Sequence, residues 1–206
     1  MNEALAWLLA QSAWEWTAVV LALAYLLLAM RESLWCWYAA FASTLIYLAL
    51  FFRVGLLMES ALQLYYLAMA VYGWWVWRGG ASNAEPLSIS RRRWRWHLVA
   101  FAGVLIASAA SGALLVRYTG AARPWADSFV TWGSLLATWM VARKLLENWL
   151  WWLLIDSISL ALYLDRGLYL TAMLFLVYLV IVVCGFIKWQ RHFRDQHAAP
   201  LATQPG

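Results

Sequence analysis

The sequence predicts an all-α integral membrane protein in which seven transmembrane helices form two parallel three-helix repeats joined by one linking helix. Three observations lead to this prediction: the apolar composition, a series of apolar stretches of span length, and a long internal repeat. The 206 residues are 66% hydrophobic and 12% charged, with a mean hydropathy of +0.68. Soluble globular domains contain about 45–50% apolar and about 25% charged residues, so this composition indicates a membrane protein.

The apolar stretches divide the chain into seven spans, each close to the roughly 17–25 residues that cross a bilayer. They cover residues 14–30, 34–52, 56–77, 96–116, 127–142, 148–165 and 167–187. Arg31-Glu32, Gly55 and Asp165-Arg166-Gly167 mark tight turns between spans. Residues 78–95 form the one long connection, which ends in a basic cluster. The polar tail at 190–206 contains two prolines and is expected to be disordered.

The N-terminus and the cysteines narrow the class of protein further. The first positive residue is Arg31, so the basic region of a signal peptide is missing and the first span is expected to stay in the membrane. Cys36 and Cys184 are too few for a disulfide framework and have no metal-ligand spacing around them. Both are expected to be small core residues, and no metal or other cofactor is expected.

One register relates the two halves of the chain. An offset of 112 residues pairs Glu15 with Asp127, Arg31 with Arg143, Trp37 with Trp149, Gly55 with Gly167, Tyr66 with Tyr178, Gly73 with Gly185 and Trp77 with Trp189. The register runs without a gap, which indicates two copies of one unit. Since three spans is an odd number, one linking span lets both copies face the same way and gives a 3+1+3 order.

This repeat sets the expected divisions of the chain. A first three-helix repeat covers residues 1–77, and a basic loop with the linking helix covers 78–126. A second three-helix repeat covers 127–189, and the tail covers 190–206. Parallel repeats are a transporter architecture, with substrate sites near the midplane at the interface between repeats.

The loops on the two sides of the membrane differ in charge. One side collects four basic residues and the other side collects eleven. Because basic loops stay inside, the second side is expected to be cytoplasmic, with the N-terminus outside and the C-terminus inside. Topology and contact with anionic headgroups of the lipid bilayer account for the net charge of +5, so nucleic acid is not an expected partner.

Polar and aromatic residues share one face of the third span. Gln63, Tyr66, Ala70, Trp74 and Trp77 follow steps of three, four, four and three, so a helix places all five on one side. A bilayer core penalises a glutamine that lacks a partner. This stripe is therefore expected to look inward, toward protein or a cavity.

The sixth span has a second stripe of the same kind. Asn148, Trp152, Asp156, Ser159 and Tyr163 follow steps of four, four, three and four. Asp156 lies in mid-span without a positive charge in its own helix, and an acidic group there is a functional-site hypothesis. Two readings stay open: a counter-ion for a cationic substrate, or a carboxyl group that ties helices together.

Two tryptophan pairs accompany the stripes: Trp74 with Trp77, and Trp149 with Trp152. Aromatic walls suit flat rings and attract cations by about 0.5–2 kcal/mol each, although ordinary packing near the membrane interface is the alternative. No hydrolase, ATPase or zinc-protease motif occurs, and the three histidines lie at the boundary of the basic loop and in the tail, so an enzyme is not expected. A membrane enzyme and an assembly protein remain the remoter alternatives to a transporter.

Over residues 14–190 the chain resembles the PnuC family of bacterial vitamin transporters. The resemblance lies in the run from Gln63 through YGWWVW, the Asp127-Ser128 pair, the run ARKLLENWLWW, and the ending from Gly185 to Trp189. It implies a homotrimer in the bacterial inner membrane, each protomer having a SWEET-like 3+1+3 fold. It also implies facilitated diffusion of an unphosphorylated vitamin, which a cytoplasmic kinase then traps.

The resemblance also implies the substrate site. Gln63, Trp74, Trp77, Asn148, Trp149 and Trp152 match the family's motif residues, and Tyr66, Asp156, Ser159 and Tyr178 complete the expected site. Nicotinamide riboside is the expected substrate and thiamine the alternative, and both carry a positive ring nitrogen. In the family pattern, nicotinamide riboside members have asparagines where this chain has Ala70, Asp156 and Cys184. The loss of three amides weakens the case for a ligand with a ribose and a carboxamide, whereas Asp156 favours a cation without choosing between the two. Another small vitamin or nucleoside is the remaining alternative.

Overall fold

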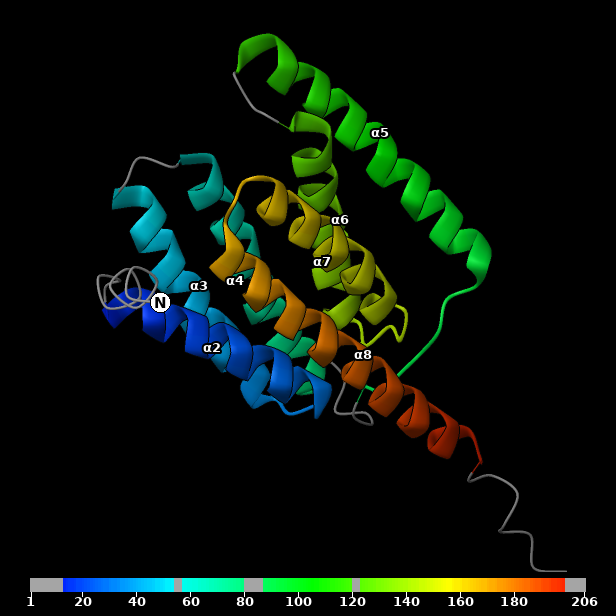
Figure 1. Cartoon of the computed structure of the whole chain (residues 1–206). Coiled ribbons are helices and arrows are strands. Elements are labelled where there is room, and N and C mark those ends of the chain that lie inside the picture. Colours follow the sequence, from blue (N-terminus) through cyan, green and yellow to red (C-terminus); the bar gives the residue numbers. More distant parts are fainter. Residues whose placement is uncertain (1–12, 54–56, 80–86, 120–122, 199–206) are drawn as a thin grey trace, which may run out of the picture. The chain divides into compact units, whose positions relative to one another are not determined.

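The structure is a computed structural model that describes residues 13–53, 57–79, 87–119 and 123–198. These residues form seven α-helices (Figure 1). They are α2 (Ala13–Met30), α3 (Trp35–Arg53), α4 (Leu57–Trp77), α5 (Trp94–Tyr118), α6 (Pro124–Ala142), α7 (Asn148–Asp165) and α8 (Tyr169–Ala198). Each overlaps one predicted span, which confirms the all-helical fold.

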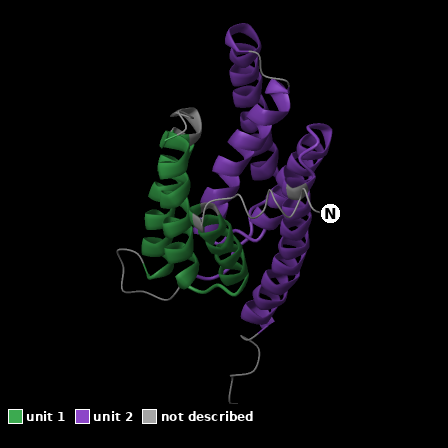
Figure 2. Ribbon diagram, turned by 60° about the vertical axis from the view of Figure 1, so that its left-hand side comes forward, with its two compact units in different colours: residues 1–86 green, residues 87–206 purple. Residues whose placement is uncertain are grey.

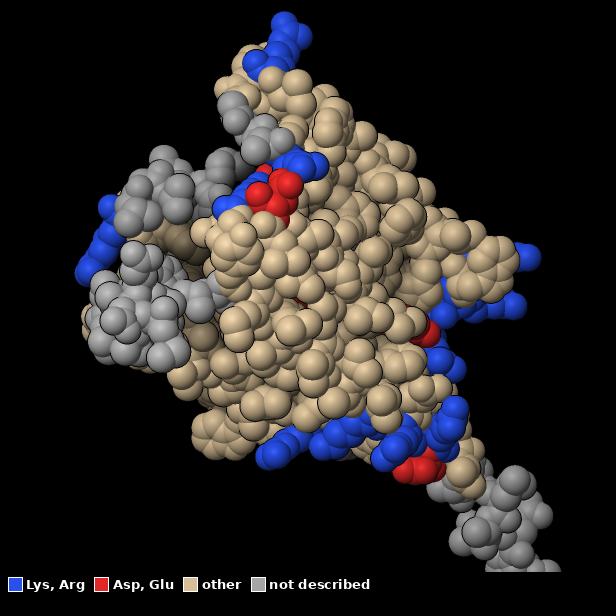
Figure 3. Space-filling view, in the orientation of Figure 1, with Lys and Arg blue, Asp and Glu red and all other residues tan. Residues whose placement is uncertain are grey.

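Several helices have the length and composition of membrane spans. Trp35–Arg53, Trp94–Tyr118 and Thr171–Ala198 are long and apolar enough to cross a bilayer, and Trp16–Met30 is a shorter apolar segment. Most of the surface seen in the space-filling view belongs to uncharged residues, and the charged side chains gather in a few patches (Figure 3). This distribution suits a protein whose helices are surrounded by lipid.

The chain forms two compact units, residues 1–86 and residues 87–206 (Figure 2). In unit 1, α3 packs against both α2 and α4. In unit 2, α5 packs on α6, α6 on α7, and α7 on α8. The linking helix α5 therefore packs with the second set of three helices.

Two boundaries differ from the prediction. Helix α6 begins at Pro124, because proline is favourable in the first turn, where its missing N–H has no partner to lose. Helix α8 continues to Ala198, so residues 190–198 are helical and the expectation of disorder there was wrong. Contacts one turn apart support this extension, including the stacking of Phe193 on His197. The expected turn at Gly55 and residues 199–206 lie outside the described residues.

The α2–α3 and α6–α7 connections have the same backbone conformation. Glu32 and Lys144, which are 112 residues apart, are the two described non-glycine residues with positive φ, at 54° and 48°. Each follows a helix that ends in a Schellman motif, in which two backbone N–H groups bond back to the last turn. The matched bonds are Glu32 N to Ala29 O and Lys144 N to Val141 O, both 2.9 Å, and Ser33 N to Leu28 O (3.0 Å) and Leu145 N to Met140 O (2.9 Å).

A tryptophan pair joins α3 to α4 in unit 1. The rings of Trp37 and Trp77 meet edge to face, with centroids 5.3 Å apart and an interplanar angle of 86°. Gly73 lets α4 approach this pair, since a Cβ atom at that position would overlap the Trp37 ring. A glycine is therefore required here by close approach of the two helices.

Unit 2 repeats this packing between α7 and α8. Trp149 and Trp189 have centroids 5.4 Å apart at 87°, and a Cβ atom at Gly185 would lie 2.6 Å from the Trp149 ring. All three residues are offset by 112 from their counterparts in unit 1. The internal repeat of the sequence thus corresponds to matched turns and matched packing.

Candidate functional site

The predicted stripe of α4 is the sheltered face of that helix. Ala70 and Trp77 are buried, and Gln63, Tyr66 and Trp74 are half-buried. The exposed apolar side chains of α4 lie on other faces, at Leu64, Val71 and Trp75. A helix that puts its polar residues inward and its apolar residues outward is arranged for a lipid surrounding.

Helix α3 fixes the ring of Trp74. Its Nε1 donates a hydrogen bond to the Tyr38 hydroxyl oxygen at 2.9 Å, and the Arg78 guanidinium lies 5.1 Å from the ring centroid. The half-buried amide of Gln63, in contrast, makes no hydrogen bond to another described residue. Gln63 therefore has both a donor and an acceptor available to a ligand.

The stripe of α7 is more deeply buried. Asn148 is 0% exposed, Asp156 5% and Ser159 3%, whereas Trp152 is half-buried. The Asn148 Nδ2 donates to the Leu145 carbonyl oxygen at 2.6 Å, but its Oδ1 is buried and accepts no hydrogen bond from the residues described. An unpaired buried acceptor costs free energy, which makes it a candidate ligand contact.

Asp156 is the buried acid of this stripe. Across the described ranges, no basic side chain pairs with its carboxyl group and no donor reaches it. Tying helices together would require such a partner, so the structure offers no support for that reading within the described residues. The carboxyl is available to a ligand, and buried acids inside membrane helices commonly mark substrate or ion pathways.

The tryptophans divide into two kinds. Trp77 and Trp149 are buried in the edge-to-face pairs inside their own units, so helix packing accounts for both rings. Trp74 and Trp152 keep part of their surface accessible. These two rings are consequently better placed to stack on a ligand than their partners in the sequence motif.

Two further tyrosines and the two cysteines complete this description. Tyr178, on α8, is half-buried and packs on Phe175 with centroids 5.4 Å apart. Tyr25, on α2, was not among the predicted site residues, and its ring packs on Trp37 with centroids 6.1 Å apart. A single hydroxyl in the otherwise apolar run of residues 18–30 was the signal that could have found it. Cys36 is buried as expected, but Cys184 is exposed, because it lies on the outer face of α8.

Comparison with known proteins places the chain among vitamin transporters. Residues 12–191 match the nicotinamide mononucleotide transporter family. The chain is 32% identical to the riboflavin/roseoflavin transporter RibM of Streptomyces davaonensis over 193 residues, which are 90% of this chain and 88% of that protein. It is 23% identical to the nicotinamide riboside transporter PnuC of Escherichia coli over 181 residues, 74% of each chain.

The fold has a relative of known structure. A crystal structure of the vitamin B3 transporter PnuC aligns with 94% of this chain and 88% of that chain, with a TM-score of 0.72 at 17% sequence identity. The apolar helices and the family match make the protein a transporter of the bacterial inner membrane. The chain belongs to the nicotinamide mononucleotide transporter family, the PnuC family of vitamin transporters.

Proposed function

We propose that this protein imports riboflavin by facilitated diffusion. The observation that carries the proposal is the similarity to a riboflavin/roseoflavin transporter along nearly the whole of both chains. The match to the nicotinamide riboside transporter is weaker and covers less of the sequence. This proposal replaces nicotinamide riboside as the first choice of substrate.

The chemistry of the candidate site is compatible with a flavin. Riboflavin has a flat, uncharged ring system, an imide N–H group and a chain of hydroxyl groups. The half-buried rings of Trp74 and Trp152 offer surfaces for stacking. Asp156 and the Asn148 Oδ1 offer acceptors for N–H and O–H donors. Asp156 then acts as a hydrogen-bond acceptor instead of a counter-ion.

Nicotinamide riboside is the second candidate, and one observation favours it. Asp156 has no basic partner within the described part of the chain, and an unpaired buried carboxylate suits a ligand with a fixed positive charge. The same argument applies to thiamine, which shares that charge. Both cations therefore belong in any binding panel.

Transport is proposed to run downhill. The sequence has no ATPase motif and no chain of acidic or histidine residues that would relay protons through the membrane. A cytoplasmic kinase would trap the vitamin by phosphorylation and so make uptake one-way. The protein is proposed to work as a homotrimer, each protomer having its own pathway.

The arrangement of the protomer is proposed as 3+1+3 with parallel repeats, supported by the matched turns at Glu32 and Lys144. The N-terminus would lie outside and the C-terminus in the cytoplasm. A reporter fused after Gly206 should then be cytoplasmic, and one placed before Met1 should be external. Both termini on one side would contradict an odd number of spans.

Uptake by proteoliposomes tests the substrate. Vesicles with the purified protein should take up riboflavin without an energy source until the concentrations inside and outside are equal, and protein-free vesicles should not. An excess of unlabelled riboflavin should compete, whereas nicotinamide riboside and thiamine should not. Uptake of a cationic vitamin but not of riboflavin would contradict the proposal, and accumulation against a gradient would contradict facilitated diffusion.

A further inference from the structure

The loop before α5 is bound to the turn between α6 and α7. The Ser90 N–H donates to the Lys144 carbonyl at 3.0 Å, and the Leu146 N–H donates to the Ser90 carbonyl at 2.9 Å. These bonds form a short parallel bridge, and Ile89 and Leu145 are buried beside it. We call residues 88–92 the strap, since they tie a distant part of the chain to the start of α7.

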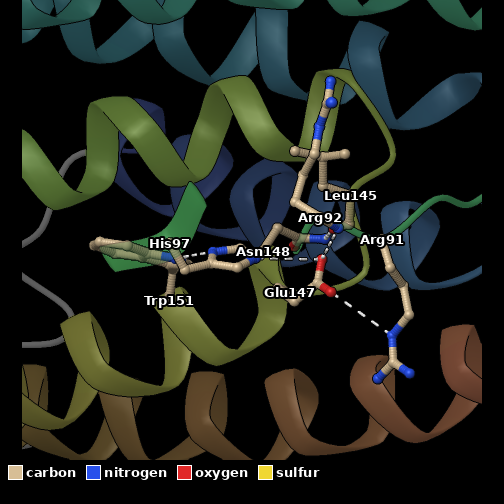
Figure 4. Close-up of polar contacts among 7 residues, drawn as sticks. All are labelled: Arg91, Arg92, His97, Leu145, Glu147, Asn148 and Trp151. Atoms are coloured by element: carbon tan, nitrogen blue, oxygen red, sulfur yellow. Dashed lines mark hydrogen bonds and ion pairs between the residues drawn. The ribbon is translucent and has the colours of Figure 1, made fainter. Parts of the chain in front are cut away.

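Three nitrogen atoms, two from the strap and one from α5, lie close to the Glu147 carboxylate (Figure 4). Its Oε1 lies 3.6 Å from the Arg91 Nε. Its Oε2 lies 3.4 Å from the backbone nitrogen of Arg92 and 3.7 Å from the His97 Nε2. The Glu147 side chain is 14% exposed, so these contacts are shielded from water more than those of a surface ion pair.

Two contacts extend this cluster to α7 and α8. The Trp151 Nε1, one turn into α7, donates to the His97 Nδ1 at 3.4 Å, which leaves the His97 Nε2 as the donor that faces Glu147. The Arg91 guanidinium lies 5.4 Å from the ring centroid of Phe193, on α8. We call Arg91, His97 and Glu147 the clasp, because they join the strap, α5, α7 and α8.

The clasp adjoins the buried amide of the candidate site. Glu147 directly precedes Asn148, and the strap residue Ser90 is hydrogen-bonded to the backbone of Lys144 and of Leu146. The Asn148 Nδ2 donates to the carbonyl of Leu145, the residue between these two and the bridge partner of Ser90. This bond fixes the Asn148 side-chain nitrogen. The Asn148 Oδ1 is buried and accepts no hydrogen bond from the described residues.

We propose that the clasp positions Asn148: Arg91, His97 and Glu147 hold the first turn of α7 so that the Asn148 Oδ1 faces the vitamin. Unit 1 has no such device at the matched position, because the residue 112 positions before Glu147 is Trp35, which is exposed. Arg91, His97 and Glu147 are positioning residues, since none of them touches the vitamin. The proposal rests on the assignment of α7 to the substrate site.

A matched pair of arginine variants tests the clasp. Arg91→Gln removes one partner of Glu147, whereas Arg92→Gln removes an equal charge from the same loop but keeps the backbone N–H that Glu147 accepts. Vitamin affinity measured by calorimetry should fall about tenfold in Arg91→Gln and less than about twofold in Arg92→Gln, with similar melting temperatures. The conservative variant Arg91→Lys keeps the positive charge beside Glu147 and should recover most of the loss.

Hydrogen–deuterium exchange at residues 145–150 gives a second measurement that needs no vitamin. Exchange there should rise in Arg91→Gln and stay at the wild-type level in Arg92→Gln. Equal exchange or equal affinity in the two variants would overturn the clasp, as would an Arg91→Lys variant that recovers nothing. Both variants should fold, because the Arg91 side chain is 47% exposed. A wild type that binds no vitamin of the panel would instead refute the proposed function, and the exchange data would still decide the clasp.

Discussion

Units 1 and 2 share their packing and differ in their polar side chains. Both have a Schellman turn with a non-glycine residue at positive φ, and both have a tryptophan pair seated on a glycine. The α7 residues Asn148, Trp152 and Asp156 nevertheless correspond to Cys36, Ala40 and Thr44 of α3. Shared positions therefore hold helices together, and divergent positions are the candidates for binding the vitamin.

The polar groups of unit 1 lie on a different helix. Gln63, on α4, corresponds to Phe175 in α8, so α4 carries the amide in unit 1 and α7 carries the amide and the acid in unit 2. Tyr66 and Tyr178 are the candidate site residues that the repeat keeps identical. The two copies of the scaffold therefore carry different polar groups.

The largest effect on stability is expected from an aspartate in α3 of unit 1, at the position that matches Asp156 of unit 2. Thr44 is buried in α3, so Thr44→Asp should destabilise the protein by about 3 kcal/mol, the usual cost of a charge at the centre of a membrane helix. The melting temperature in detergent measures the loss. Thr44→Asn serves as the uncharged control, and an equal loss there would mean that size, not charge, is responsible.

The next largest effect concerns the shared glycines. Gly73→Ala and Gly185→Ala would each push a methyl group into a tryptophan ring, and overpacking of this kind costs about 1–3 kcal/mol. Gly103→Ala is the control, because no atom lies within 4 Å of a Cβ built there, and it should be neutral or slightly stabilising. If only one of the two shared glycines were sensitive, the packing of the units would not be equivalent.

A smaller effect is expected from the hydrogen bond that is confined to unit 1. Trp74→Phe and Tyr38→Phe each remove the bond between these side chains, and each should lower the unfolding free energy by about 1 kcal/mol. The double variant should lose little more than either single variant. Additive losses would show that the two side chains act independently.

The smallest effect is expected at one end of unit 2, where two ion pairs join α6 to α7. Arg123 contacts Asp165 through two hydrogen bonds of 2.9 and 3.1 Å, and Arg166 contacts Asp127 at 2.9 Å. The side chains are 36–55% exposed, so Arg123→Ala should cost less than about 1 kcal/mol, and less still in high salt. If the loss of unfolding free energy did not depend on salt, the Arg123–Asp165 pair would have to be shielded from the aqueous solution.

The sequence allowed much of the fold to be predicted, because apolar runs and turn residues report local structure. The offset of 112 residues also identified the matched glycines and tryptophans. Periodicity could show which face of α4 is sheltered, but not which neighbour covers it. For this reason the packing of Trp77 on Trp37 was not foreseen, nor that of Trp149 on Trp189.

Long-range and tail contacts were harder to anticipate. The strap joins Ser90 to Leu145 across 55 residues by backbone hydrogen bonds, and no side-chain pattern encodes such a pairing. The helical extension beyond Gln190 depends on contacts such as Phe193 with Arg91, in a loop far away in sequence. A polar composition alone could not distinguish this extension from disorder.

Riboflavin binding to Asp156→Thr tests most directly whether the divergent positions bind the vitamin. This variant gives α7 the residue that unit 1 has at the matched position. Removing a hydrogen bond to a charged group costs about 1.5–3 kcal/mol, so affinity should fall at least about tenfold. The melting temperature should be unchanged or higher, because a buried acid is lost. The shared-position variant Trp37→Phe should instead lower the melting temperature and keep the affinity; unchanged riboflavin affinity in a well-folded Asp156→Thr protein would contradict the account.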